Sequence, residues 1–187
     1  MKFHDMYVPG LLSIKPDVFD DERGQSYETF SLRDLENAVG KPLKFVQDFH
    51  SRSKKGVLRG LHYQHPRAQG KLVRCTRGEI YDVVVDLRAG SPTFGTWEAE
   101  VLSEMNHSLL WVSPGFAHGF YVMSDVADVS YRMTNYRYPD DEKVVLWNDP
   151  EVNVVWPFKN GFQPIVSKRD SEGTSLSKAV LFAVEHM

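Results

Sequence analysis

The sequence contains one cysteine, almost no net charge and no long apolar run. Cys75 has no second cysteine with which to form a disulfide within the chain, and its alternation with Val73 predicts a small buried side chain. The 22 Lys and Arg residues against 25 Asp and Glu give a formal net charge of −3, without the basic excess typical of nucleic-acid binding. No stretch has the length of a membrane span or the pattern of a signal peptide. We therefore expect a cytoplasmic protein that binds neither nucleic acid nor a membrane.

No internal repeat, low-complexity tract or linker divides the chain. Its 187 residues suit one domain that can bury a hydrophobic core without a disulfide or a structural metal. The sequence therefore predicts a single domain over residues 1–187.

Strand-like segments dominate, and they are rich in β-branched and aromatic residues. They lie at residues 43–50, 71–88, 97–103, 108–113, 119–124, 128–134 and 142–147. Segments with the composition of tight turns lie at residues 90–92, 114–115, 138–142 and 148–150. Many short strands joined by turns predict an all-β sandwich or closed barrel.

Helical pattern is confined to two segments. In residues 31–40, Ser31 is a candidate N-cap, apolar residues three or four apart form one face, and Gly40 is a candidate C-terminal stop. Residues 175–187 predict a second short helix that lies across the sandwich. Both helices are expected at the periphery of the sheets.

Histidine supplies the first candidates for chemistry. His62 and His65 share one strand-like segment, and His118 ends a Pro-x-x-x-His run, which is one way in which metal-binding jelly rolls supply a ligand. Such sites usually also need an His-x-His pair and a glutamate on an earlier strand, and this chain offers neither near His62. We therefore expect no metal, with a metal-dependent oxygenase or isomerase as an alternative.

The segment "SKKGVLRGLHYQHP", residues 53–66, suits an anion site beside a base. The planar guanidinium of Arg59 matches a phosphate, and Lys71 could stabilise a developing oxyanion. Histidine is the side chain best suited to act as a base near neutral pH, so His62 is the candidate base. Regular alternation would put Arg59 and His62 on opposite faces of a strand, but a bulge at Gly60 would bring them together.

Several ordered motifs resemble those of the dTDP-4-dehydrorhamnose 3,5-epimerase family. They are "KGVLRGLHYQ", "GKLVRCTRGEIYDVVVDLRAGSPTFG", "PGFAHGF", "WNDP" and "SKRD", and the match runs from about residue 21 to Asp170. The resemblance implies a cupin jelly roll without metal or cofactor. It also implies a homodimer that acts on a nucleotide-diphosphate-linked 4-keto-6-deoxy sugar. The apolar run "AVLFAV", residues 179–184, offers a surface for a second subunit.

The resemblance also implies roles for single residues. His62 would be the general base and Asp170 its orienting partner, while Tyr131 would be the general acid on the opposite face of the sugar. Lys71 would stabilise the enolate, Lys71 and His118 would lie near the keto oxygen, and Asp82 would lie behind the residues that contact the substrate. The positions matched to substrate binding are Arg23, Glu28, Gln47, Arg59, His118, Glu142 and Arg169. For Arg23 and Glu28, pairing with each other across a hairpin is an alternative.

The chemistry accounts for these residue types. A ketone at C4 acidifies the hydrogens on C3 and C5, and removal of either proton produces an enolate, so a base, an oxyanion stabiliser and an opposed acid are needed. Neutral His62 can take the proton at physiological pH, and Asp170 would stabilise the imidazolium that forms. The carbonyl of the substrate is itself the electron sink, so no cofactor is required.

The sequence departs from the family pattern where the nucleotide base should lie. Phe49 stands where the family usually has Asn, Ser26 stands where an aromatic residue is common, and Arg137 replaces a tyrosine that usually stacks on thymine. Phe49 or Arg137 could stack on a base instead. The preferred base therefore stays open.

We expect epimerisation at C3 and C5, from dTDP-4-dehydro-6-deoxy-D-glucose to dTDP-4-dehydro-L-rhamnose. One alternative is epimerisation at a single carbon of a related nucleotide sugar, which the altered base region could favour. Another is a non-catalytic jelly roll that only binds a sugar nucleotide. A pure binding protein would not need the set of base, lysine and acid.

Overall fold

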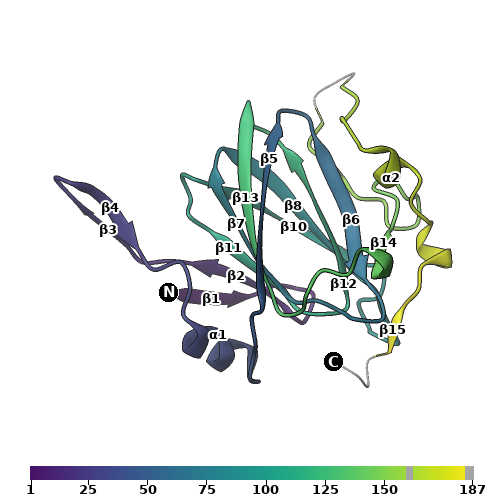
Figure 1. Cartoon of the computed structure of the whole chain (residues 1–187), viewed down its shortest axis with the longest axis horizontal. Helices are drawn as coiled ribbons and strands as arrows, with labels where there is room; N and C mark the ends of the chain where they lie inside the picture. The colour runs from purple at the N-terminus through teal and green to yellow at the C-terminus, as the bar shows by residue number, and fades with distance from the viewer. Residues whose placement is uncertain (159–161, 184–187) are drawn as a thin grey trace.

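Two antiparallel β-sheets form the body of the molecule (Figure 1). The computed structural model describes residues 1–158 and 162–183. The six-stranded sheet has the order β1 (Lys2–Asp5), β2 (Leu11–Lys15), β11 (Leu109–Val112), β7 (Lys71–Arg77), β13 (Val126–Met133) and β5 (Gln47–Lys54). The five-stranded sheet has the order β10 (Trp97–Ser103), β8 (Glu79–Asp86), β12 (Phe116–Val122), β6 (Leu58–Gln64) and β14 (Glu142–Val144). The predicted all-β sandwich is confirmed.

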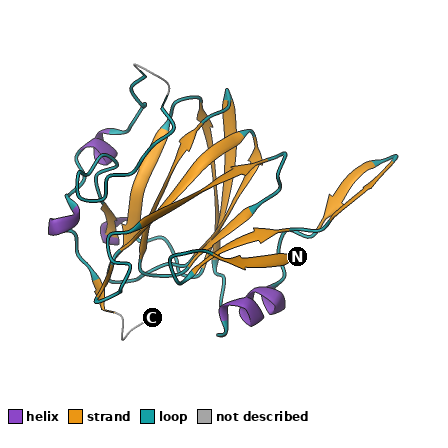
Figure 2. Ribbon diagram, turned by 180° about the vertical axis from the view of Figure 1, so that it is seen from behind, coloured by secondary structure: helices purple, strands orange, loops and turns teal. Residues whose placement is uncertain are grey.

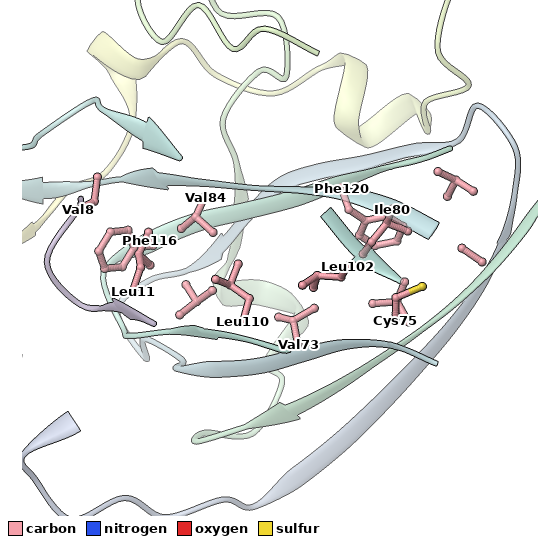
Figure 3. Close-up of a cluster of buried hydrophobic side chains, with 14 residues drawn as sticks. Val8, Leu11, Val73, Cys75, Ile80, Val84, Leu102, Leu110, Phe116 and Phe120 are labelled. Carbon is pink, nitrogen blue, oxygen red and sulfur yellow. The ribbon is translucent and has the colours of Figure 1, made fainter. Parts of the chain in front are cut away.

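The main hydrophobic core lies between the two sheets (Figure 3). On β7, Val73 and Cys75 point into this core, whereas Leu72 belongs to a cluster on the outer face, as the period of two along a strand requires. The predicted burial of Cys75 is confirmed. Burial raises the pKa of its thiol to about 11, which leaves it unreactive at neutral pH.

Gly78 divides one predicted strand, residues 71–88, into two strands that belong to different sheets. Its φ of 74° lies in the left-handed region, and an added Cβ would stand 2.0 Å from the Val126 carbonyl oxygen. Only glycine therefore fits this turn. The strand predicted from residue 43 also differs, because β5 begins at Gln47.

Helix α1 (Leu32–Val39) packs on the outer face of the six-stranded sheet. The Ser31 hydroxyl caps it by accepting a hydrogen bond from the Asp34 N–H at 3.3 Å, and Gly40 ends it in the left-handed conformation. Leu35 is fully buried beneath the helix. The first predicted helix is therefore confirmed.

The remaining helices are single turns at the periphery of the sheets (Figure 2). They are η1 (Pro139–Asp141), α2 (Lys168–Ser171) and η2 (Leu176–Lys178). Across residues 1–158 and 162–183, no helix is long and apolar enough to cross a bilayer.

The predicted C-terminal helix is wrong for the residues that the structure describes. After η2 the chain forms β15 (Phe182–Ala183), which pairs in parallel with β9 (Arg88–Ala89). Phe182 is buried, with its ring centroid 5.9 Å from that of Tyr63. This packing overrides helical propensity and uses part of the run predicted to face a second subunit. Residues 184–187 lie outside the described part of the chain.

A hairpin of β3 (Val18–Asp21) and β4 (Gly24–Tyr27) projects away from the sandwich (Figure 1). Arg23 lies in its turn and donates hydrogen bonds to the Asp21 carboxylate. Glu28 follows β4 and is exposed, so the alternative in which Arg23 pairs with Glu28 is wrong. Phe19 on this hairpin is 68% exposed.

Candidate active site

A cavity of about 500 Å³ opens among strands β5, β6, β7, β12 and β13 and the segment that carries α2. All four residues predicted to be catalytic line it, namely His62, Lys71, Tyr131 and Asp170. Six predicted substrate contacts also line it, namely Phe49, Arg59, His118, Arg137, Glu142 and Arg169. Residues from both ends of the chain are thus brought to one place.

A β-bulge in β6 turns Arg59 and His62 toward the same cavity. His62 pairs with His118 on β12, but Arg59 pairs with Phe120, so β6 carries one more residue than its partner over this interval. Gly60 lies in the bulge with a φ of 126°, and an added Cβ would lie 2.6 Å from a neighbouring glycine Cα. The bulge predicted at Gly60 is confirmed.

His62 and Asp170 form the first of two histidine–aspartate pairs. The His62 Nε2 atom lies 2.6 Å from Asp170 Oδ1. The His62 side chain is 37% exposed, whereas that of Asp170 is 4% exposed. Burial acts to raise the pKa of Asp170, but hydrogen bonding and charge from His62, with the Gly60 N–H, outweigh it and lower the pKa. The carboxylate is therefore ionised and can hold an imidazolium.

His118 and Asp82 form the second pair, at the buried end of the cavity. The His118 Nε2 atom lies 2.8 and 2.9 Å from the two Asp82 carboxylate oxygens. Both side chains are almost fully buried. Burial raises the pKa of Asp82, and the charges of His118 and Lys71 oppose that rise. This pair has little access to solvent.

Lys71 lies near both pairs. Its ammonium is 3.5 Å from the His62 carbonyl oxygen. Burial lowers its pKa to about 8, against the opposing charges of Asp82 and Glu142. A cationic donor of this kind can stabilise an oxyanion inside the cavity.

Tyr131 faces the cavity from the sheet opposite to that of His62. It lies on β13 of the six-stranded sheet, whereas His62 lies on β6 of the five-stranded sheet. Its ring centroid is 5.8 Å from that of His118 and 6.1 Å from that of Phe49. Burial raises the pKa of its phenol, so Tyr131 carries a proton at neutral pH and can donate it.

The mouth of the cavity holds two arginines on one carboxylate. Arg137 Nε lies 2.5 Å from Glu142 Oε1, and Arg169 donates to the other oxygen of Glu142. The backbone N–H of Arg137 donates to Gln47 Oε1 at 2.8 Å. Burial acts to raise the pKa of Glu142, but the two arginines lower it overall. Phe49, beside this group, is 44% exposed.

Four predicted site residues do not line the cavity. Gln47 supports the Arg137 backbone, and Asp82 lies behind His118. Arg23 and Glu28 lie on or beside the projecting hairpin. The structure therefore joins the predicted catalytic set and leaves these two residues apart from it within one chain.

The sequence interpretation missed two serines of β5. Ser51 lines the cavity, and the Ser53 hydroxyl accepts a hydrogen bond from Arg59 Nε at 3.0 Å. Both alternate with Phe49 along the strand, so the period of two could have assigned them to the same face. In the part of the chain that the structure describes, no three His, Cys, Asp or Glu side chains converge in an arrangement that could hold a metal ion.

Comparison with known proteins identifies the family. The family model described as dTDP-4-dehydrorhamnose 3,5-epimerase matches residues 5–178. The chain belongs to this family. The predicted resemblance is confirmed, and the chain is an isomerase of the dTDP-4-dehydrorhamnose 3,5-epimerase type.

Relatives and solved structures of the dTDP-4-dehydrorhamnose 3,5-epimerase family match nearly the whole chain. The dTDP-4-dehydrorhamnose 3,5-epimerase of Pseudomonas aeruginosa is 47% identical over 182 residues, which cover 97% of this chain and 99% of that protein. The dTDP-6-deoxy-D-glucose-3,5-epimerase of Legionella pneumophila, in complex with dTDP-4-keto-L-rhamnose, has a TM-score of 0.93 and 42% identity, with 97% of each chain covered. The predicted cupin jelly roll is confirmed by this match.

A single-carbon epimerase shares the fold. The structure of a 3'-monoepimerase from Streptomyces bikiniensis, in complex with dTDP-quinovose, has a TM-score of 0.91 and 32% identity. The match covers 97% of this chain and 93% of that one. Membership of the epimerase fold is therefore compatible with reaction at one carbon or at two.

Proposed function

We propose that this chain inverts both C3 and C5 of dTDP-4-dehydro-6-deoxy-D-glucose and so produces dTDP-4-dehydro-L-rhamnose. Epimerase activity on a dTDP-4-keto sugar is the activity of its family. The observation that carries the proposal is that His62 and Tyr131 face one cavity from opposite sheets. Lys71 lines the same cavity. Inversion needs a base and an acid on opposite faces of the sugar.

His62 is the general base in this proposal. The Asp170 carboxylate, 2.6 Å away, fixes the tautomer of the imidazole and stabilises the imidazolium that forms when a proton leaves carbon. Because His62 is partly exposed, it can release the proton to solvent after the first inversion and before the second.

Lys71 and His118 stabilise the enolate. The negative charge develops on the C4 oxygen as His62 takes the proton, and a protonated Lys71 beside the cavity offsets it. His118, held by both Asp82 oxygens, is a second fixed donor or dipole there. Tyr131 then protonates carbon from the opposite face, and its raised pKa keeps the proton available until that step.

Arginines bind the diphosphate. Arg59, Arg137 and Arg169 bring three guanidinium groups to the cavity and its mouth, and each can donate paired hydrogen bonds to phosphate oxygens. The exposed face of Phe49 suits stacking against a nucleotide base. The complex of the Legionella pneumophila relative with dTDP-4-keto-L-rhamnose supports a thymidine nucleotide here.

Arg23 and Glu28 complete the proposed substrate contacts only in a homodimer. They stand on or beside a hairpin that points away from the cavity of their own chain (Figure 1), so they can meet substrate only in the cavity of a second copy. Mixing Arg23→Ala chains with His62→Ala chains should then restore activity, because one cavity of each mixed dimer keeps both residues. A monomer in a solution mass measurement, or no restoration in dimers shown to be mixed, would contradict this assignment.

The function is tested by proton NMR of dTDP-4-keto-6-deoxyglucose with the protein in deuterium oxide. Loss of both the C3 and the C5 proton signals, with formation of the L-rhamno product, is the expected result. Loss of one signal would establish the single-carbon alternative. Binding of the nucleotide sugar without exchange would indicate a non-catalytic protein, and exchange that stops with a chelator would indicate a metal-dependent enzyme.

A further inference from the structure

Ser51 is a buried hydroxyl in the cavity that the proposed reaction does not yet use. Its side chain points inward from β5 between Phe49 and Ser53, and the residue is only 9% exposed. Its Oγ atom has no hydrogen-bond partner among the described residues. The Ser53 hydroxyl, two positions along the same face, does have one in Arg59. Burial of an unpaired hydroxyl is unfavourable, which suggests that this group is used during the reaction.

The position of Ser51 puts it beside Tyr131. In the pairing of β5 with β13, Phe49 lies opposite Tyr131 and Ser51 lies opposite Val129. Ser51 is therefore a diagonal neighbour of Tyr131, at a backbone separation of about 7–8 Å that a long aromatic side chain spans. Burial raises the pKa of the Tyr131 phenol, and the nearby Ser51 hydroxyl acts in the opposite direction. The Ser51 hydroxyl therefore favours the charged phenolate form of Tyr131.

The proposed function requires Tyr131 to be reprotonated. Each inversion leaves an extra proton on His62 and removes one from Tyr131, so inversion at two carbons uses the acid twice. His62 is 37% exposed and can give its proton to solvent. Tyr131 is left as a phenolate in a place where burial disfavours the charge, and it needs a donor close by.

We propose that the Ser51 hydroxyl donates a hydrogen bond to the Tyr131 phenolate and relays a proton from cavity water to it. As the Ser51 proton moves to the Tyr131 oxygen, Ser51 takes a proton from water. The proton that His62 releases neutralises the resulting hydroxide, so the cycle balances in atoms and charge. This role rests on the proposed function and makes Ser51 a positioning residue for Tyr131.

The test compares Ser51→Ala with the wild type in deuterium oxide, with dTDP-4-keto-6-deoxyglucose as the probe. Loss of C3 and C5 protons should continue near the wild-type rate, because His62 and Lys71 are intact. Inversion should fall about ten- to a hundredfold, which is the effect of losing a hydrogen bond to a charged group. Ser51→Thr keeps the hydroxyl on a residue that suits a strand, and it should restore inversion.

Ser53→Ala is the matched control, because it removes a hydroxyl from the same face of the same strand. It should raise KM through Arg59 and leave the ratio of inversion to exchange as in the wild type. A wild-type ratio in Ser51→Ala would overturn the role of Ser51, as would a Ser51→Thr variant that is as impaired as Ser51→Ala. Absence of exchange in the wild type would instead overturn the proposed function, and the role of Ser51 with it.

Discussion

The cavity holds two histidine–aspartate pairs of the same composition in different surroundings. His62 is partly open to solvent and its partner Asp170 has a lowered pKa, whereas His118 and Asp82 are both almost fully buried and the pKa of Asp82 is raised. A group that must take and release protons needs solvent access. A group that holds a fixed dipole at an oxyanion instead benefits from being shielded from solvent. These surroundings support the proposed roles, with proton transfer at the first pair and charge stabilisation at the second.

The largest effect is expected when each of the two histidines is replaced by alanine. His62→Ala should abolish deuterium exchange at both C3 and C5, a loss of about 10³-fold or more for removal of a positioned base. His118→Ala should retain measurable exchange, with a loss of about a hundredfold for one oxyanion donor. Proton NMR in deuterium oxide measures both. Equal losses in the two variants would remove the distinction between the pairs.

A smaller effect is expected at Tyr131, which lies beside the buried pair. Tyr131→Phe should leave exchange in place, because the base is intact, and should reduce inversion about a hundredfold by removing the acid. The ratio of product formed to deuterium incorporated measures this directly. Loss of exchange and inversion in equal proportion would mean that Tyr131 also takes part in proton removal.

The pH dependence separates the two aspartates. Only protonated Lys71 stabilises an enolate, so the rate should fall as the pH rises above its pKa of about 8. Asp82 raises that pKa, so Asp82→Asn should move this alkaline limb about one pH unit lower. Asp170→Asn should lower the rate and leave the limb in place. A pH profile of kcat for the three proteins checks this, and an unmoved limb in Asp82→Asn would contradict it.

The smallest effect is expected from loosening only the exposed pair. The Ser167 hydroxyl caps α2 by accepting a hydrogen bond from the Asp170 N–H at 3.1 Å. Ser167→Ala should reduce kcat/KM about three- to tenfold, in line with the usual cost of a lost cap. The alkaline limb should not move. A shifted limb would show that α2 also acts on Lys71, which would weaken the contrast between the pairs.

The local parts of this site were predictable from the sequence. Gly60 beside Arg59 indicated a bulge, and the structure has one there, in a conformation that leaves no room for a side chain. The cap and stop of α1 were equally local. The resemblance to the family identified His62, Lys71, Tyr131 and Asp170 as the candidate catalytic residues, but it did not give the distances between them.

The remaining features depend on contacts between distant segments. The register of β8 against β12 sets the buried pair, since Asp82 lies opposite Phe120, two residues beyond His118. No local pattern contains that register. The C-terminal helix was predicted from a segment whose propensity is overridden by burial of Phe182. Arg137 reaches Glu142 from only five residues away, but Arg169 reaches the same carboxylate across 27 residues of chain.

The turn at Gly78 has a consequence for the order in which the site assembles. It joins β7 of one sheet to β8 of the other, so Lys71 and Asp82 are brought together by a short loop. His118, the partner of Asp82, follows 36 residues later in the chain. The contact between His62 and Asp170 instead closes 108 residues of chain. Short closures form early and long ones late. During folding, Lys71 and the His118–Asp82 pair would therefore come together before the His62–Asp170 pair. On partial denaturation, the His62–Asp170 contact would be lost first, and the protein would become inactive while the sandwich is still folded.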